Sequence, residues 1–197
     1  MAKNVFISYR YADGIHYKNE LSNKFDRFYD TVDFSEDEDR SRMTDETIRQ
    51  YLYAKLRRSS VTIVLLTPQA LNHKKNWYGV YDDWMYDEIR YSLEDRGNNR
   101  TNGLIAVYTP EAASSIVTPL SNGNISIANV DNLCRRNMMN IKSSYKTNPN
   151  YNVFDRDWDS YCSLLSWQEF LSNIGKYINI ATKKREELYK YDMVKRL

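Results

Sequence analysis

The sequence predicts an α/β fold in which helices cover both faces of a doubly wound, mostly parallel sheet. Continuous apolar runs, as expected of strands buried on both faces, occur at 61–66 and 103–108, and a proline closes each run. Segments with apolar residues at helical spacing lie between the strand-like runs. Strands and helices therefore alternate along the chain, which is typical of parallel sheets because each helix returns the chain to the same end of the sheet.

The first strand and the first helix are predicted near the N-terminus. Residues 5–9 are β-branched and aromatic but turn polar at Ser8 and Arg10, which indicates a buried strand that leads into a loop. Apolar residues then recur at helical spacing from about Gly14 to Tyr29. Asp13 is the expected N-cap of this helix.

A second strand and helix follow before the apolar run at 61–66. The strand is expected at 31–34. The charged run from Ser35 to Arg42 is too polar to bury and is expected to be a loop. Thr44 is the expected cap of the next helix, whose last turn carries Lys55, Arg57 and Arg58, where the helix dipole favours cations.

The helix after the third strand carries the most informative residues. Met85, Ile89 and Leu93 form a row at i, i+4 and i+8, which is the natural core contact. Trp84 and Glu88 form a second row about 100° away, given ~3.6 residues per turn. We expect this second row at the border of the buried stripe, where an indole can form the wall of a cleft and a carboxylate can face into it. A half-buried Trp and a surface Glu would be the commoner outcome for such a pair.

The pattern weakens beyond Pro110. Short strands are expected at 125–127 and 151–154. A capping box at Ser166-Trp167-Gln168-Glu169 then begins a helix. The charged segment from Lys183 to Leu197 is expected to be a fraying helical end.

Length and composition limit the class of protein. A chain of 197 residues suits one domain, in which we expect 1–110 to carry the site and 111–197 to complete the sheet and add a helical C-terminal extension. A net charge of +2 does not indicate a nucleic-acid-binding face. No apolar run approaches the ~20 residues of a membrane span, and no signal-peptide pattern precedes the first strand. Cys134 and Cys162 lack metal-ligand spacing, so no metal site is expected. Because the chain has only these two cysteines and no signal-peptide pattern, a reducing, cytoplasmic location is expected.

Ligands of open α/β sheets bind beyond the carboxyl ends of the strands, near the point where strand order reverses. Three stretches are expected to meet there: residues 8–10 after the first strand, 34–37 after the second, and the segment with Trp84 and Glu88 after the third. The sequence therefore predicts one cleft formed by all three.

This combination, in this order, resembles a TIR domain of the NAD-consuming branch. The residues that carry the resemblance are Val5-Phe6-Ile7-Ser8-Tyr9-Arg10, Asp33, Thr67-Pro68 and Trp84-x-x-x-Glu88-Ile89. The likeness covers about Lys3 to Pro110. The remainder is similar in length and character to the small bacterial TIR-like proteins of Thoeris anti-phage systems.

The resemblance implies a flavodoxin-like fold and an enzyme in which Glu88 is essential for breaking the bond between nicotinamide and ribose. NAD would be the substrate, and no cofactor is implied. The product would be a cyclic ADP-ribose isomer or a related conjugate, a diffusible nucleotide that activates a partner effector, and TIR domains would self-associate. By similarity Trp84 would line the nicotinamide side, and the same pocket would be bordered by Phe6, Ser8, Tyr9, Arg10 and Asp33.

The chemistry suits these residue types. Cleavage of an N-glycosidic bond passes through an oxocarbenium-like state, which a nearby carboxylate can stabilise. Nicotinamide leaves as a neutral molecule from a cationic ring, so one carboxylate suffices. An indole beside the cationic ring contributes about 1 kcal/mol, and Arg10 is a candidate partner for the pyrophosphate or a ribose oxygen. Two segments depart from the pattern of the TIR family. They are the acidic loop 35–42 and the insertion at 73–79, which is either a lid or a longer loop.

Two other functions stay open. A non-catalytic TIR module that acts only by assembly would make Trp84 and Glu88 packing and surface residues. Nucleoside deoxyribosyltransferases have a similar architecture and a nucleophilic glutamate, although Ser8-Tyr9-Arg10 favours a TIR domain.

Other classes with small α/β folds are excluded. A phospho-receiver would need an acidic pair and an acceptor Asp that the strand ends lack, and the chain has no glycine-rich phosphate loop. His16 and His73 are isolated and are expected to have surface or capping roles.

Overall fold

The computed structural model describes residues 3–28, 31–33, 45–71, 84–95, 99–121, 125–148, 150 and 153–197. Its main sheet has five strands in the order β2-β1-β3-β4-β7, and every neighbouring pair is parallel. Strand order reverses between β1 and β3, so the α/β, flavodoxin-like prediction is confirmed. The strands are β1 (Lys3–Ser8), β2 (Thr31–Asp33), β3 (Val61–Leu66), β4 (Gly103–Tyr108) and β7 (Cys162–Ser166).

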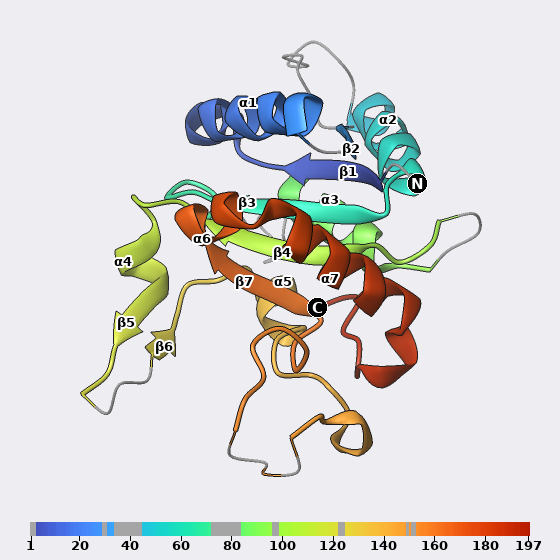
Figure 1. Ribbon diagram of the computed structural model, residues 1–197. Coiled ribbons are helices and arrows are strands. Elements are labelled where there is room, and N and C mark those ends of the chain that lie inside the picture. The colour runs from blue at the N-terminus through green and yellow to red at the C-terminus, as the bar shows by residue number, and fades with distance from the viewer. Residues whose placement is uncertain are drawn as a thin grey trace.

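Helices cover both faces of this sheet (Figure 1). Successive strand residues point to opposite faces, so alternate residues of β1, β3 and β4 enter different core clusters. On one face lie α1 (Tyr11–Phe28), α6 (Trp167–Ser172) and α7 (Ile174–Glu186). On the other lie α2 (Asp45–Arg58), α3 (Trp84–Leu93) and α5 (Asn132–Arg136).

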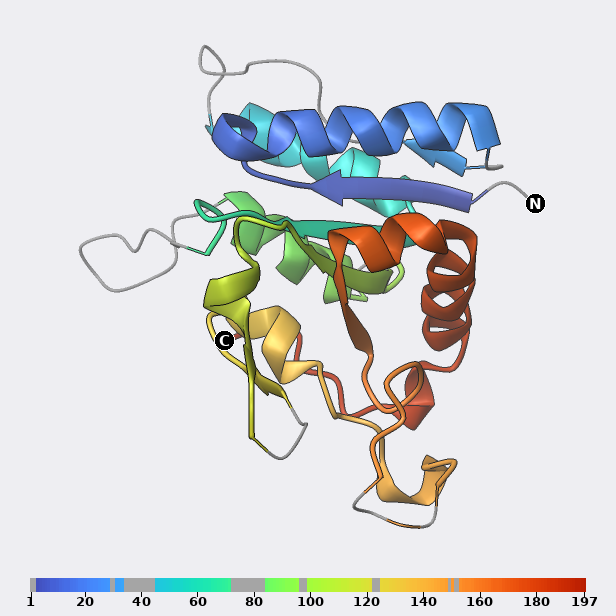
Figure 2. The same cartoon turned by 60° about the vertical axis from the view of Figure 1, so that its left-hand side comes forward.

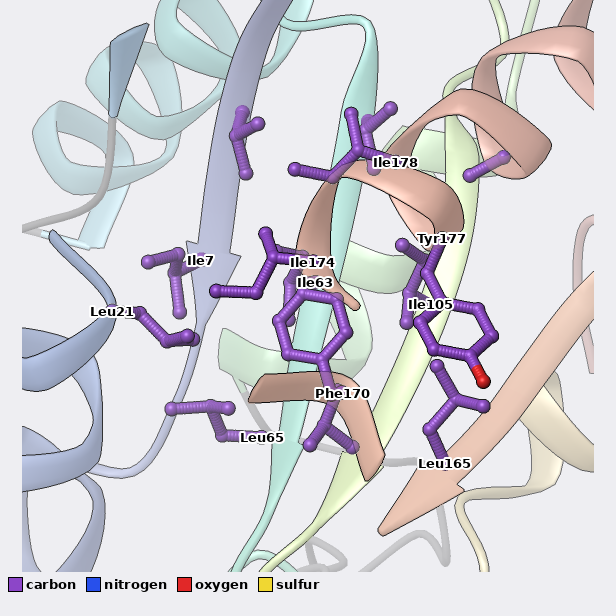
Figure 3. Packing of buried hydrophobic residues seen from close by; sticks show 14 of the residues in the cluster. Ile7, Leu21, Ile63, Leu65, Ile105, Leu165, Phe170, Ile174, Tyr177 and Ile178 are labelled. Carbon is purple, nitrogen blue, oxygen red and sulfur yellow. The ribbon is translucent and has the colours of Figure 1, made fainter. Parts of the chain in front are cut away.

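One large buried cluster lies under α1, α6 and α7. Phe170 and Ile174 extend from these helices over Ile63 of β3 and Ile105 of β4, as Figure 3 shows. All four side chains are fully buried. This packing fixes the central strands from the face opposite to α3.

The first helix begins earlier than predicted, and Asp13 is not its N-cap. Because α1 begins at Tyr11, Asp13 lies within the first turn. Its carboxylate accepts hydrogen bonds from Thr67 Oγ1 at 2.7 Å and from the backbone N–H of Gln69 at 2.9 Å. Asp13 therefore ties α1 to the loop that follows β3. Thr44, the expected cap of α2, lies outside the described residues, as do the loops 35–42 and 73–79.

The strand β7 was missed by the sequence prediction. Serines at its second and last positions interrupt the apolar run that marked β3 and β4. The strand predicted at 125–127 is present as β6 (Ile125–Ile127), but it pairs antiparallel with β5 (Val117–Pro119) in a separate small sheet. Figure 1 shows this hairpin, next to the short helix α4 (Ala113–Ile116), projecting from the main sheet. The strand predicted at 151–154 is not observed at Val153 and Phe154, and 151–152 lie outside the described residues.

The C-terminal part begins as predicted and ends differently. Ser166 Oγ accepts a hydrogen bond from the backbone N–H of Glu169 at 3.2 Å, which confirms Ser166 as the cap. The other half of the predicted capping box is not formed, because the Glu169 carboxylate accepts hydrogen bonds from Arg156 and Tyr177. The charged end is not a fraying helix: after α7 and a 3₁₀ turn η2 (Leu188–Lys190), residues 191–197 are not helical and pack back onto the domain. We call residues 191–197 the tail segment. No helix in the described part of the chain is long and apolar enough to span a membrane.

Candidate functional site

The carboxyl end of β1 meets α3 where the strand order reverses. Ser8, the last residue of β1, donates a hydrogen bond from Oγ to Oε2 of Glu88 at 2.5 Å. Both residues are buried, with 1% of Ser8 and 9% of Glu88 exposed. A hydroxyl on an ionised carboxylate makes a short, strong hydrogen bond. Ser8 thus fixes the orientation of a carboxylate that is 80 residues away in sequence.

The packing of α3 explains why Glu88 faces the strand end. The predicted row of Met85, Ile89 and Leu93 is buried, which confirms the core face of this helix. Ser92 Oγ donates to the backbone carbonyl of Glu88 at 2.7 Å and lies 2.8 Å from Thr62 Oγ1 on β3. The backbone that carries Glu88 is therefore fastened to the sheet by a buried polar contact as well as by apolar packing.

A second helix fixes the next side of α3. The rings of Tyr53 on α2 and Tyr91 on α3 are stacked with centroids 3.9 Å apart. Arg90 donates to the Tyr53 hydroxyl at 3.2 Å and lies 3.3 Å from Asp87. The stacked rings and the hydrogen bond from Arg90 to Tyr53 join the two helices and resist sliding of one along the other, whereas the Arg90–Asp87 pair lies within α3. We conclude that α3 is a rigid support for Glu88.

The other residues predicted at the site lie around the end of β1. Phe6 is fully buried and packs in a cluster with α2. Tyr9 packs against the cluster on the opposite face, beside Gly14 of α1. Arg10 is half-buried at the start of α1, and its backbone carbonyl accepts from the N–H of Gly14 at 2.7 Å. Among these residues, the structure brings Ser8 into direct contact with Glu88 and places Tyr9 on the other face of the sheet.

Two predicted residues are placed by their backbone alone. Asp33 ends β2 and lies opposite Val5 of β1 in the parallel register. Trp84 begins α3, one helical turn before Glu88. The side chains of Asp33 and Trp84 lie outside the described part of the structure.

Sequence reasoning missed a second polar contact at the same edge of the sheet. The Tyr17 hydroxyl donates to Oε2 of Glu111 at 2.6 Å, which joins α1 to the turn after β4. Burial, together with this hydrogen bond, raises the pKa of Tyr17 to about 12, and the bond from Tyr17 lowers the pKa of Glu111. The rings of Tyr17 and Trp167 pack edge to face with centroids 4.7 Å apart. Glu111 follows a strand and a proline, a position with no periodic signal that would have predicted the pair.

Among the residues that the structure describes, no group of three or more His, Cys, Asp or Glu side chains could hold a metal ion. Cys134 and Cys162 are free thiols and both are buried. A hydrogen bond with Cys162, together with burial, raises the pKa of Cys134. Buried thiols with a raised pKa are poor nucleophiles and poor metal ligands.

A family model described as "Thoeris protein ThsB, TIR-like domain" matches residues 6–114 of the chain. The matched residues run from β1 into α4 and include both Ser8 and Glu88. They form more than half of the chain and four of the five strands of the main sheet. The protein therefore belongs to the family of TIR-like domains of the Thoeris protein ThsB.

Proposed function

We propose that this protein cleaves NAD between nicotinamide and ribose and releases an ADP-ribose-derived, cyclic signal molecule that activates an anti-phage effector. The observation that carries the proposal is the hydrogen bond between Ser8 and Glu88. It holds a buried carboxylate at the strand-order reversal, the part of an open α/β sheet where ligands bind. Membership of a Thoeris TIR-like family supports the same reaction class.

In the proposed reaction Glu88 stabilises the positive charge that develops on the ribose as nicotinamide departs. The leaving group becomes neutral, so no acid is needed to protonate it. A carboxylate that is already oriented requires little reorganisation in the transition state, which is the main source of electrostatic catalysis. The role of Ser8 is to supply that orientation through its hydroxyl.

The remaining roles follow from the positions of the backbone and from the resemblance to NAD-consuming TIR domains. Trp84 would stack beside the cationic nicotinamide ring, one turn before Glu88. Arg10, at the start of α1, would bind the pyrophosphate or a ribose oxygen. Asp33 would complete the border of the pocket. Phe6, which is fully buried, and Tyr9, which packs on the opposite face of the sheet from Glu88, are not proposed as contacts of the substrate. Assembly of several TIR domains and a downstream effector that binds the product are the proposed partners.

The test is to incubate the purified protein with NAD, with and without lysate from phage-infected cells, and to measure nicotinamide and ADP-ribose species by chromatography and mass. In Glu88→Gln we expect nicotinamide release to fall by about 100-fold or more, as when one transition-state partner is removed. Ser8→Ala should lower kcat by about 10- to 150-fold, because a hydrogen bond to a charged group contributes ~1.5–3 kcal/mol. Glu186→Gln is the matched control, since this exposed residue ends α7 on the opposite face of the sheet.

Equal turnover by wild type and Glu88→Gln would refute the catalytic assignment. Absence of nicotinamide release in both conditions would instead favour a module that acts by assembly, and sedimentation of the protein would then test self-association. The mass of the second product distinguishes cyclisation from hydrolysis or conjugation.

A further inference from the structure

The tail segment contacts α3 along one side. Arg196 Nε donates to Oε1 of Glu94 at 2.6 Å, and only 6% of the Glu94 side chain is exposed. Arg90 Nη1 lies 3.7 Å from the same oxygen of Glu94. The backbone N–H of Leu197 donates to the Tyr86 hydroxyl at 3.3 Å. Two residues of the tail segment thus reach both ends of the helix that carries Glu88.

The contacted side of α3 faces away from the proposed catalytic residue. Tyr86, Arg90 and Glu94 are four residues apart and share one row of the helix. At ~100° per residue, Glu88 lies about 160° from Tyr86 and Arg90 and about 120° from Glu94, so it points away from that row. On either side of α3, between Glu88 and this row, the helix packs on the sheet and on α2. The tail segment therefore supplies the contact that completes the enclosure of α3.

A small rotation of α3 would disrupt the site. Side chains reach about 5–6 Å from a helix axis, so a rotation of ~20° moves the end of a side chain by about 2 Å. The hydrogen bond between Ser8 and Glu88 spans 2.5 Å and does not tolerate such a shift. The orientation of Glu88 thus depends on what holds the opposite side of the helix.

The tail segment is itself firmly attached. Asn137 donates to the carbonyl of Val194 at 2.7 Å and accepts from its N–H at 3.0 Å. Asp192 exchanges two hydrogen bonds with Asn140, through its N–H at 2.8 Å and its carbonyl at 3.0 Å. The carbonyl of Asn137 accepts from Cys162 of β7 at 2.8 Å, so this attachment continues into the sheet. In Figure 2 the C-terminal end lies beside α5, near the face that α3 covers.

We propose that the tail segment is a clasp that fixes the rotation of α3, with Arg196 as a positioning residue that acts through Glu94 on the Ser8–Glu88 contact. The proposal rests on the NAD-cleaving function above. It assigns a role in the reaction to residues outside the 6–114 match of the family. According to this proposal, the ion pair between Arg196 and Glu94 affects the position of Glu88, and this effect is separate from any effect on global stability.

The test compares Arg196→Ala, Arg196→Lys and the control Lys195→Ala, which removes the same charge from the preceding exposed position. Hydrogen exchange of peptides covering 84–95 reports on α3 without any need for catalysis. We expect exchange in Arg196→Ala to be about 5- to 10-fold faster and kcat for NAD about 5- to 10-fold lower, as for loss of a hydrogen-bonded ion pair. KM should stay within about twofold, since the contact that the structure describes for Arg196 is with Glu94 and not with a residue of the proposed pocket. Arg196→Lys should restore most of kcat, and Lys195→Ala should match wild type.

Each outcome is decisive. Unchanged exchange of α3 in Arg196→Ala overturns the clasp, and faster exchange with unchanged kcat overturns the positioning role. If Glu94→Gln and Arg196→Ala have additive effects on kcat, Arg196 does not act through Glu94. If the wild-type protein releases no nicotinamide, the proposed function fails, and the exchange rates alone decide whether the tail segment holds α3.

Discussion

Replacing Gly103 by alanine tests how closely α7 packs on the sheet. Gly103 begins β4, and a β-carbon built on it lies 2.3 Å from the carbonyl oxygen of Ala181 and 2.6 Å from the carbonyl carbon. Ordinary contacts between carbon and oxygen begin near ~3.3 Å. The helix must therefore move outward by about 1 Å to admit one methyl group.

The cost follows from the rigidity of the obstacle. Adding a methyl group to a packed core costs ~1–3 kcal/mol when side chains can adjust. Here the obstacle is helix backbone, and a gap of up to ~1 Å forfeits a quarter to a half of the dispersion energy of each contact that α7 makes. We expect the free energy of unfolding to fall by about 3 kcal/mol, which corresponds to ~6–12 °C in Tm for a protein of this size.

Urea unfolding followed by far-ultraviolet circular dichroism measures this loss as a lower midpoint with an unchanged slope. Gly14→Ala is the matched control: its β-carbon would lie 3.2 Å from Cβ and Cδ2 of Tyr9, a much smaller overlap than at Gly103. Alanine also gains ~1 kcal/mol over glycine within a helix, so the control should change stability by less than about 1 kcal/mol. Adding Ala181→Gly to Gly103→Ala should not restore stability. Restoration by that second change, or wild-type stability of Gly103→Ala, would refute the reasoning.

Two further predictions concern pH. Lys184 is fully buried with its ammonium 2.9 Å from Ser163 Oγ, and burial lowers its pKa from 10.5 to about 8. The unfolded chain then binds more protons between pH 8 and 10.5, so stability should rise with pH across that window in wild type. Urea titrations at pH 7.5 and 9.5 measure the free energy of unfolding at each pH. Lys184→Met should remove the rise between them that wild type shows, and an equal rise in both proteins would contradict the assignment. Tyr17→Phe should cost about 1 kcal/mol at pH 7. The hydrogen bond from Tyr17 depresses the pKa of Glu111, so the greater stability of wild type over Tyr17→Phe should be lost as pH falls below 4.5. A stability difference that persists in acid unfolding would contradict this prediction.

Much of the sheet was predictable because buried parallel strands have a simple signature. The runs at 61–66 and 103–108 are continuously apolar, and the structure places β3 and β4 there. The fifth strand was not predictable in this way, since serines break the apolar run of Cys162–Ser166. Its place in the sheet depends on pairing with β4, a long-range contact that leaves no local pattern.

The candidate site was predictable to a similar extent. The apolar row of α3 and the rule for strand-order reversal together predict that Glu88 and Ser8 approach each other, and they are in contact. The tail segment was predicted as helix because its charged residues resemble a helix end. Asparagine side chains at 137 and 140 hold it instead, and hydrogen bonds of this kind have no periodicity in sequence.

The pairing of β4 with β7 has a practical consequence for fragments of this protein. A piece cut at the end of the matched region, after residue 114, would lack β7 and leave β4 as an open edge. Six residues of almost wholly buried, apolar strand would then present unpaired backbone groups to any neighbouring chain. Such an edge is a template for intermolecular pairing. Aggregation of a fragment of this kind would report the loss of β7 and would carry no information about the assembly of the intact protein.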